Sequence, residues 1–106
     1  MLLPKSWDEV FKASFADLQK DIHQNAIDHG FYPPGITDFT ILDKVIEELE
    51  ECFDAVVIGD DDDLLKEMAD VCLVVINWAE HKGWNLARAI LDKNEFNRTR
   101  PYLHKV

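Results

Sequence analysis

The sequence has few of the residues that define disulfide-rich or zinc-binding proteins. Its 106 residues include only 2 Cys, 4 Pro and 4 Gly, and no Cys-x-x-Cys pair is present. Two cysteines cannot form a disulfide scaffold, and without closely spaced pairs they do not indicate a zinc site. We therefore expect Cys52 and Cys72 to be small buried apolar residues.

Positive charge is also scarce, since 11 Lys and Arg stand against 21 Asp and Glu and the net charge is −10. Long phosphate backbones are bound mainly by Lys and Arg, so this balance argues against nucleic-acid polymers as partners. No apolar run approaches the ~20 residues that span a bilayer, and the first residues lack the apolar region of a signal peptide. We expect a cytoplasmic protein without a membrane partner.

The residues that are present are typical of a single folded domain covering residues 1–106, because 47% of them are hydrophobic. The few Gly and Pro residues divide the chain into four segments, each with apolar residues at helical spacing. The predicted helices run from about Ser6 to His29, Asp38 to Val57, Asp62 to Lys82, and Asn85 to a point before Pro101. The predicted fold class is therefore all-α, a four-helix bundle unit.

The third predicted helix is apolar almost all round in its second half, from Val71 to Ala79. Such a helix must be covered on several sides. Four short helices cannot easily surround it, so we predict that homo-oligomerisation completes the core, as a dimer or a tetramer.

Two of the predicted helices carry acidic pairs on one face. Glu48 and Glu51 lie three residues apart on the second helix, as do Glu67 and Asp70 on the third. Because a short connection makes these helices antiparallel neighbours, the four carboxylates should converge. Converging carboxylates repel one another, and Mg²⁺ or Mn²⁺ would relieve that repulsion through oxygen ligands. The alternative is that these are solvated surface acids.

The fourth predicted helix carries Lys93, Asn97 and Arg100 at spacings of four and three residues, which place them on one face. Cationic and amide donors in one stripe suit a polyphosphate, since Arg can bind phosphate bidentately. The alternative is a solvated basic face near a helix C-terminus, where the helix dipole favours positive charge.

Together these motifs resemble the MazG-like family of all-α nucleoside triphosphate pyrophosphohydrolases, in its short single-domain form. The resemblance covers about residues 20–105 and includes the segment from Ile22 to Tyr32. Its motifs are Glu47-Glu48-x-x-Glu51, Glu67-x-x-Asp70 with Asn77 seven residues later, and Lys93-x-x-x-Asn97-x-x-Arg100.

The resemblance implies Mg²⁺-dependent hydrolysis of a (deoxy)nucleoside triphosphate to the monophosphate and pyrophosphate, in nucleotide-pool house-cleaning. Its implied metal ligands are Glu48, Glu51, Glu67 and Asp70. Glu47 and Glu48 are the catalytic candidates, and which carboxylate accepts the proton of the attacking water is left open. The substrate-binding candidates are Lys93, Asn97, Arg100, Asn77, His23 and Lys44.

Several alternatives stay open at this point. His23 either recognises a base or covers a helix surface, and Lys44 either pairs with Glu48 or approaches a phosphate. A phosphoribosyl-ATP pyrophosphohydrolase-like enzyme would have a similar helical fold and acidic motif. A non-enzymatic acidic helical-bundle adaptor would use the same carboxylates only as surface charge.

Overall fold

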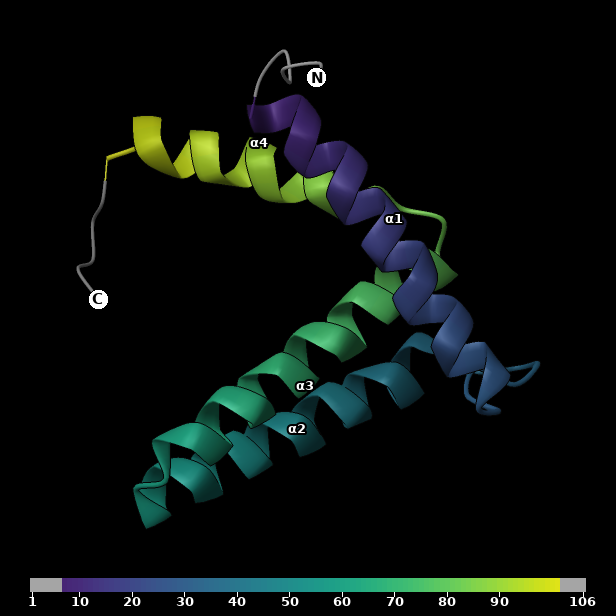
Figure 1. Cartoon of the computed structure of the whole chain (residues 1–106), viewed down its shortest axis with the longest axis vertical. Coiled ribbons are helices and arrows are strands. Elements are labelled where there is room, and N and C mark those ends of the chain that lie inside the picture. Colours follow the sequence, from purple (N-terminus) through teal and green to yellow (C-terminus); the bar gives the residue numbers. More distant parts are fainter. Residues whose placement is uncertain (1–6, 102–106) are drawn as a thin grey trace, which may run out of the picture.

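The computed structural model describes residues 7–101 of the chain, which form helices and connecting loops and contain no strand. The all-α prediction is confirmed (Figure 1). The predicted helix boundaries agree to within one residue, except that Ser6 lies outside the described residues. The helices are α1 (Trp7–Asp28), α2 (Asp38–Ile58), α3 (Asp61–His81) and α4 (Leu86–Thr99).

Local sequence signals set the connection between α2 and α3. Thr37 caps α2, because its hydroxyl accepts a hydrogen bond from the Thr40 N–H at 3.3 Å. Asp60 caps α3, because its carboxylate accepts from the Asp63 N–H at 3.0 Å. Between the two helices Gly59 has a φ of 82°, a left-handed conformation that glycine adopts without a Cβ penalty. The chain therefore reverses direction within two residues.

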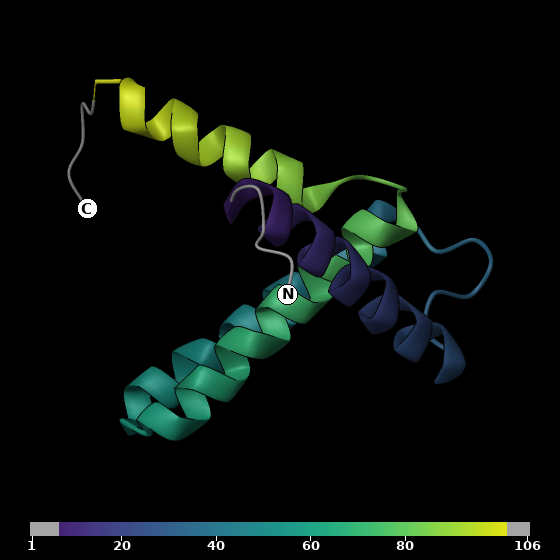
Figure 2. The same cartoon turned by 45° about the horizontal axis from the view of Figure 1, so that its top comes forward.

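The helices α2 and α3 lie side by side and antiparallel, as predicted, and residues 38–81 are called the α2–α3 arm below (Figures 1 and 2). The helix α1 packs against α3, and α4 packs against α1 and α3. Gln19 of α1 is buried, and its Nε2 donates to the Glu80 carboxylate at 2.7 Å and to the Trp84 carbonyl at 2.9 Å. This side chain ties α1 to the junction of α3 and α4.

Within one chain the core is small. The buried apolar residues of the described part are Ile41, Ala55, Ala79 and Ala87. The prediction that Cys72 is buried is wrong, since it is exposed, and Cys52 is half-buried. The reason is that α1 and α2 leave one side of α3 uncovered, so the apolar second half of α3 is not enclosed by this chain.

Large apolar side chains of α2 point away from the small core. The buried residues of α2 are Ile41, Glu48 and Ala55, and they face α3, the one helix that α2 contacts in the described part of the chain. The exposed apolar residues recur at alternating intervals of three and four, a spacing typical of faces that pack on further helices. We call this set the outer seam: Phe39, Leu42, Ile46, Leu49, Phe53 and Val56, which are 41–79% exposed. Among the described helices, none is long and apolar enough to cross a membrane.

Candidate metal centre and adjoining cleft

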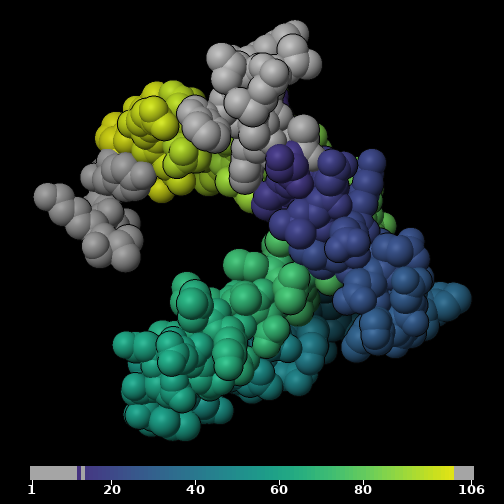
Figure 3. Space-filling model, in the orientation of Figure 1, coloured from purple at the N-terminus to yellow at the C-terminus, as the bar shows by residue number. Residues whose placement is uncertain are grey.

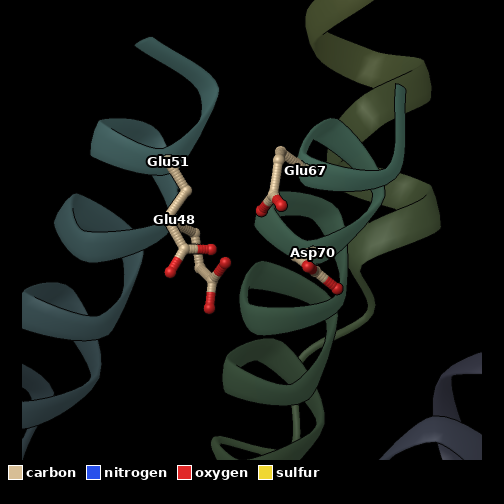
Figure 4. A group of neighbouring side chains, drawn as sticks. All are labelled: Glu48, Glu51, Glu67 and Asp70. Atoms are coloured by element: carbon tan, nitrogen blue, oxygen red, sulfur yellow. The ribbon is translucent and has the colours of Figure 1, made fainter. Parts of the chain in front are cut away.

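Four carboxylates meet between α2 and α3 (Figure 4). Glu48 and Glu51 project from α2, while Glu67 and Asp70 project from α3, and one oxygen of each lies within 4.8 Å of the others. The convergence expected from the two i, i+3 pairs is therefore present. We call these four residues the acid cluster.

The acid cluster concentrates negative charge in a partly enclosed place. Glu48 is 7% exposed, and the buried Oε2 atoms of Glu48 and Glu67 have no hydrogen-bond partner in the described part of the chain. A hydrogen bond with Glu67 and repulsion from its charge raise the pKa of Glu51, as expected for crowded acids. Buried carboxylate oxygens without partners are costly. The oxygen donor set and its two orphaned atoms therefore fit a hard divalent cation.

Lys44 offsets part of this charge. Its Nζ lies 3.1 Å from Glu48 Oε1 and 3.2 Å from Glu47 Oε1. The hydrogen bond to Glu48, followed by that to Glu47, raises the pKa of Lys44. The pairing that the sequence left open is therefore present, and the contact of Lys44 with a phosphate stays a prediction.

A cleft of about 960 Å³ adjoins the acid cluster. The end of α1, residues 29–36, the first half of α2 and the middle of α3 form its walls, and Glu48 and Asp70 reach it. Glu47 also lines the cleft, so both catalytic candidates lie where the cleft meets the acid cluster. The volume falls in the range typical of small-molecule sites.

His23 of α1 and Asn77 of α3 form a hydrogen-bonded pair next to this cleft. The Nδ1 of His23 lies 3.2 Å from the Asn77 Oδ1, and the Asn77 Nδ2 donates to the Leu73 carbonyl at 3.0 Å. Because a carbonyl oxygen only accepts, this second bond fixes which way the amide points. The Nδ1 of His23 must then carry the proton and donate it to Asn77.

The rings of Tyr32 and His81 lie close to the ring of His23. The Tyr32 ring centroid lies 4.8 Å from that of His23 and 5.0 Å from that of His81. Tyr32 has a φ of 62°, which is uncommon for a bulky residue, and burial raises the pKa of its hydroxyl. His81 had a signal in the sequence, because it follows Asn77 by four residues on one helix face. Tyr32 lies in a loop and had no periodic signal.

The predicted substrate residues of α4 are not brought to the cleft within the chain. None of Lys93, Asn97 and Arg100 lines it. Lys93 Nζ lies 4.7 Å, and the Arg100 guanidinium carbon 5.6 Å, from the centroid of the Phe96 ring. The Oδ1 of Asn97 is buried without a hydrogen-bond partner among the described residues. The roles of these three residues stay predictions.

Comparison with known proteins gives one match. The family model described as MazG nucleotide pyrophosphohydrolase domain matches residues 37–101, from the cap of α2 to just beyond α4. The match contains the acid cluster and the basic stripe of α4, and it leaves α1 with His23 outside. No curated protein and no solved structure matches the chain.

Proposed function

Because the chain belongs to the MazG nucleotide pyrophosphohydrolase family, we propose that it hydrolyses a (deoxy)nucleoside triphosphate to the monophosphate and pyrophosphate, with Mg²⁺ or Mn²⁺ as cofactor. The observation that carries this proposal is the acid cluster, four carboxylate oxygens within 4.8 Å at the edge of a cleft of about 960 Å³. The biological role that we propose is nucleotide-pool house-cleaning.

Each acidic residue has a distinct task in this proposal. A divalent cation held by the acid cluster would neutralise phosphate charge and lower the pKa of a bound water. Glu47 is exposed beside the cluster, with one oxygen on Lys44. It lies within the cleft wall next to Glu48, so we assign it as the acceptor of the proton that the attacking water loses.

We propose one orientation for the substrate in the cleft. The triphosphate lies toward the acid cluster, where a cation and Lys44 can contact its oxygens. The nucleoside lies toward Asn77 and His23, whose amide and ring offer polar contacts and a stacking surface. This orientation places the bond between the α- and β-phosphates near Glu47 and Glu48.

Pyrophosphate release from the standard ribo- and deoxyribonucleoside triphosphates, with Mg²⁺ and with EDTA, tests the proposal. Glu48→Gln and Asp70→Asn should each lower turnover and Mn²⁺ affinity by more than the roughly 10–100-fold that loss of an outer-shell partner costs. Asp62→Asn is the matched control, since it removes an exposed acid from the first turn of α3, and it should keep both.

The alternatives predict other results. If Glu48→Gln leaves Mn²⁺ affinity unchanged, the carboxylates act only as surface charge, as in an acidic adaptor. Release of pyrophosphate from phosphoribosyl-ATP, but from no standard triphosphate, would instead indicate a phosphoribosyl-ATP pyrophosphohydrolase-like enzyme. Absence of release from every one of these compounds would contradict the proposed function.

We also propose that the protein self-associates through the outer seam, as a dimer or a tetramer. A stripe with three-four spacing can pack against its own copy across a two-fold axis, which buries the same residues on both sides. The net charge of −10 opposes a nucleic-acid polymer as partner. The partners that we propose are therefore the nucleotide and further copies of the chain.

A further inference from the structure

The cleft extends well beyond the acid cluster. Along α2 it is lined by Thr40 and Ile41 and, about two helical turns later, by Glu47 and Glu48. We call the end formed by residues 28–36 and the start of α2 the loop end of the cleft, and it lies at the surface beside the end of α1 (Figure 3). In the proposed function the phosphates occupy the acid cluster, so the loop end is left for the base.

His29, the first residue after α1, lines the loop end with a fixed hydrogen-bonding pattern. Its Nδ1 lies 2.7 Å from the carbonyl oxygen of Asn25. Because a backbone carbonyl only accepts, the Nδ1 of His29 must carry the proton. In the neutral ring the Nε2 then carries a lone pair and can only accept a hydrogen bond. The His29 side chain makes no other hydrogen bond within the described residues.

The cap of α1 holds the backbone on both sides of Gly30. The Gly30 N–H donates to the Ile27 carbonyl and the Phe31 N–H donates to the Ala26 carbonyl, both at 3.0 Å. Gly30 has a φ of 84°, which lets the chain leave the helix at this residue. His29 and Phe31 are therefore positioned before any ligand binds, and pre-organised groups bind at a lower entropic cost.

Phe31 offers an aromatic surface at the same end of the cleft. Its side chain lines the cleft and is exposed. Every nucleobase has a flat π-face, so an aromatic ring in a cleft wall can stack on any of them. Phe31 therefore suits a base without reading which base it is, and discrimination must come from polar groups nearby.

The charged groups at the loop end are acceptors like His29. Asp28 and Asp43 line the cleft, and carboxylate oxygens accept hydrogen bonds without donating. Of the described residues that line the cleft, only Lys44 is a lysine or arginine, and its ammonium contacts Glu47 and Glu48 beside the acid cluster. The amide and hydroxyl side chains of the cleft can donate or accept, so they fit either kind of base. The groups with a fixed role therefore favour a base that presents N–H groups.

We infer that the loop end selects a nucleobase with an amino group, cytosine or adenine, whose amino group donates to the Nε2 of His29 while its ring stacks on Phe31. The inference rests on the proposed function and names its substrate class. In uracil and hypoxanthine a carbonyl oxygen replaces the amino group. Two acceptors would then face each other, and both would lose a hydrogen bond that water supplies. His29 is thus a specificity-determining residue.

Two pairs of triphosphates that differ in this group test the inference, CTP with UTP and ATP with ITP. Pyrophosphate release is measured with Mg²⁺ at pH 8, where an ordinary imidazole is neutral. We expect kcat/KM to favour the amino member of each pair by at least about 10-fold, because one hydrogen bond is gained and one repulsion is avoided. Equal kcat/KM values within each pair, or a preference for the carbonyl member, would overturn the inference and leave the proposed function standing.

Substitutions of His29 assign the preference to its side chain. His29→Ala removes the acceptor and should bring both ratios toward one, mainly by raising KM for CTP and ATP. His29→Lys replaces the acceptor by a donor and should reverse the preference, a result that a loss of packing would not produce. Ratios that survive His29→Ala unchanged would contradict the assignment.

Two further variants separate stacking from base reading. Phe31→Leu keeps His29 and should raise KM for all four triphosphates alike, with the ratios unchanged. Asp17→Ala is the matched control, because Asp17 is exposed on α1 and does not line the cleft, and it should keep wild-type values. A change of the ratios in Phe31→Leu as large as in His29→Ala would show that His29 is not the reading group.

A second measurement does not depend on turnover. The ¹⁵N signal of the His29 Nε2 is followed by NMR while CMP or UMP is added to the wild-type protein with Mg²⁺. A hydrogen bond accepted by this nitrogen shifts its signal, so CMP should shift it much more than UMP does. Equal shifts, or no binding of either nucleotide, would overturn the inference. A shift with CMP alone would support it even if no triphosphate proves to be a substrate.

Discussion

At the scale of the single residue, Asn77 determines which ring nitrogen of His23 carries the proton in the neutral ring. Its amide is held by the Leu73 carbonyl on one side, so its oxygen faces His23 and accepts the Nδ1 proton. In the neutral ring the Nε2 of His23 then carries the free lone pair and can only accept a hydrogen bond. A base that presents an N–H group to this ring would fit the site.

We therefore predict that His23 is the Nδ1–H tautomer in the wild-type protein near neutral pH. Long-range ¹H–¹⁵N NMR spectra of the imidazole nitrogens distinguish the two tautomers. Asn77→Leu removes the acceptor at similar volume and should release the preference, so that the Nε2–H form becomes populated. Asn94→Leu, on the exposed surface of α4, should leave the tautomer unchanged. A wild-type His23 in the Nε2–H form would contradict the assigned geometry.

Residues of the candidate site differ in how far sequence could predict them. The acid cluster was predictable, because i, i+3 spacing is a local property of a helix and a short turn brings two helices together. Tyr32 was not, because its place beside His23 and His81 depends on a left-handed loop conformation and on tertiary packing. The spacing of residues around Tyr32 indicates neither the loop conformation nor the packing.

At the scale of the element, the α2–α3 arm is fastened at both ends, with the acid cluster between them. One end is the tight turn at Gly59. At the other end Asp38, in the first turn of α2, accepts from Trp78 Nε1 at 2.8 Å and from Lys82 Nζ at 3.1 Å. The hydrogen bond from Trp78, followed by that from Lys82, lowers the pKa of Asp38.

This clamp predicts a pH-dependent contribution to stability. A folded-state pKa below the unfolded value of about 3.9 stabilises the protein above that pH, and the contribution is lost as the pH falls through the folded value. Asp38→Ala should therefore lower Tm at pH 7, and its difference from wild type should shrink below pH ~4.

Two companion variants sharpen the test of Asp38. Asp38→Asn keeps an oxygen for the Trp78 N–H and should have an intermediate Tm at pH 7. Asp54→Ala removes an exposed carboxylate from the same helix and should change Tm little. A Tm difference for Asp38→Ala that is equally large at pH 3 and pH 7 would show that its charge does not contribute.

At the scale of the whole molecule, the sequence predicted the four helices better than it predicted which helices pack against one another. Leu42, Ile46 and Leu49 of α2 recur at helical spacing, but periodicity does not say which neighbour such a stripe faces. In the structure the stripe faces away from α3, because the narrower strip of Ile41, Glu48 and Ala55 fills that contact. The position of α4 likewise depends on packing against α1, which no local pattern encodes.

The exposed outer seam leads to the prediction of self-association. Wild-type protein should sediment at micromolar concentration above the mass of one chain. Burying a Leu or Phe side chain contributes roughly 1.5–3 kcal/mol. Leu49→Glu or Phe53→Glu should therefore weaken association by at least about 10-fold. Val57→Glu, which adds the same charge on α2 outside the seam, should associate like wild type.

Self-association and metal binding can be separated in the same variants. Leu49→Glu leaves every residue of the acid cluster in place, so a single chain should still bind Mn²⁺. Helix content measured by circular dichroism should remain, because the α2–α3 contact does not use the outer seam. A wild-type protein that stays a single chain at micromolar concentration, or a Leu49→Glu variant that associates as tightly as wild type, would contradict self-association through the outer seam.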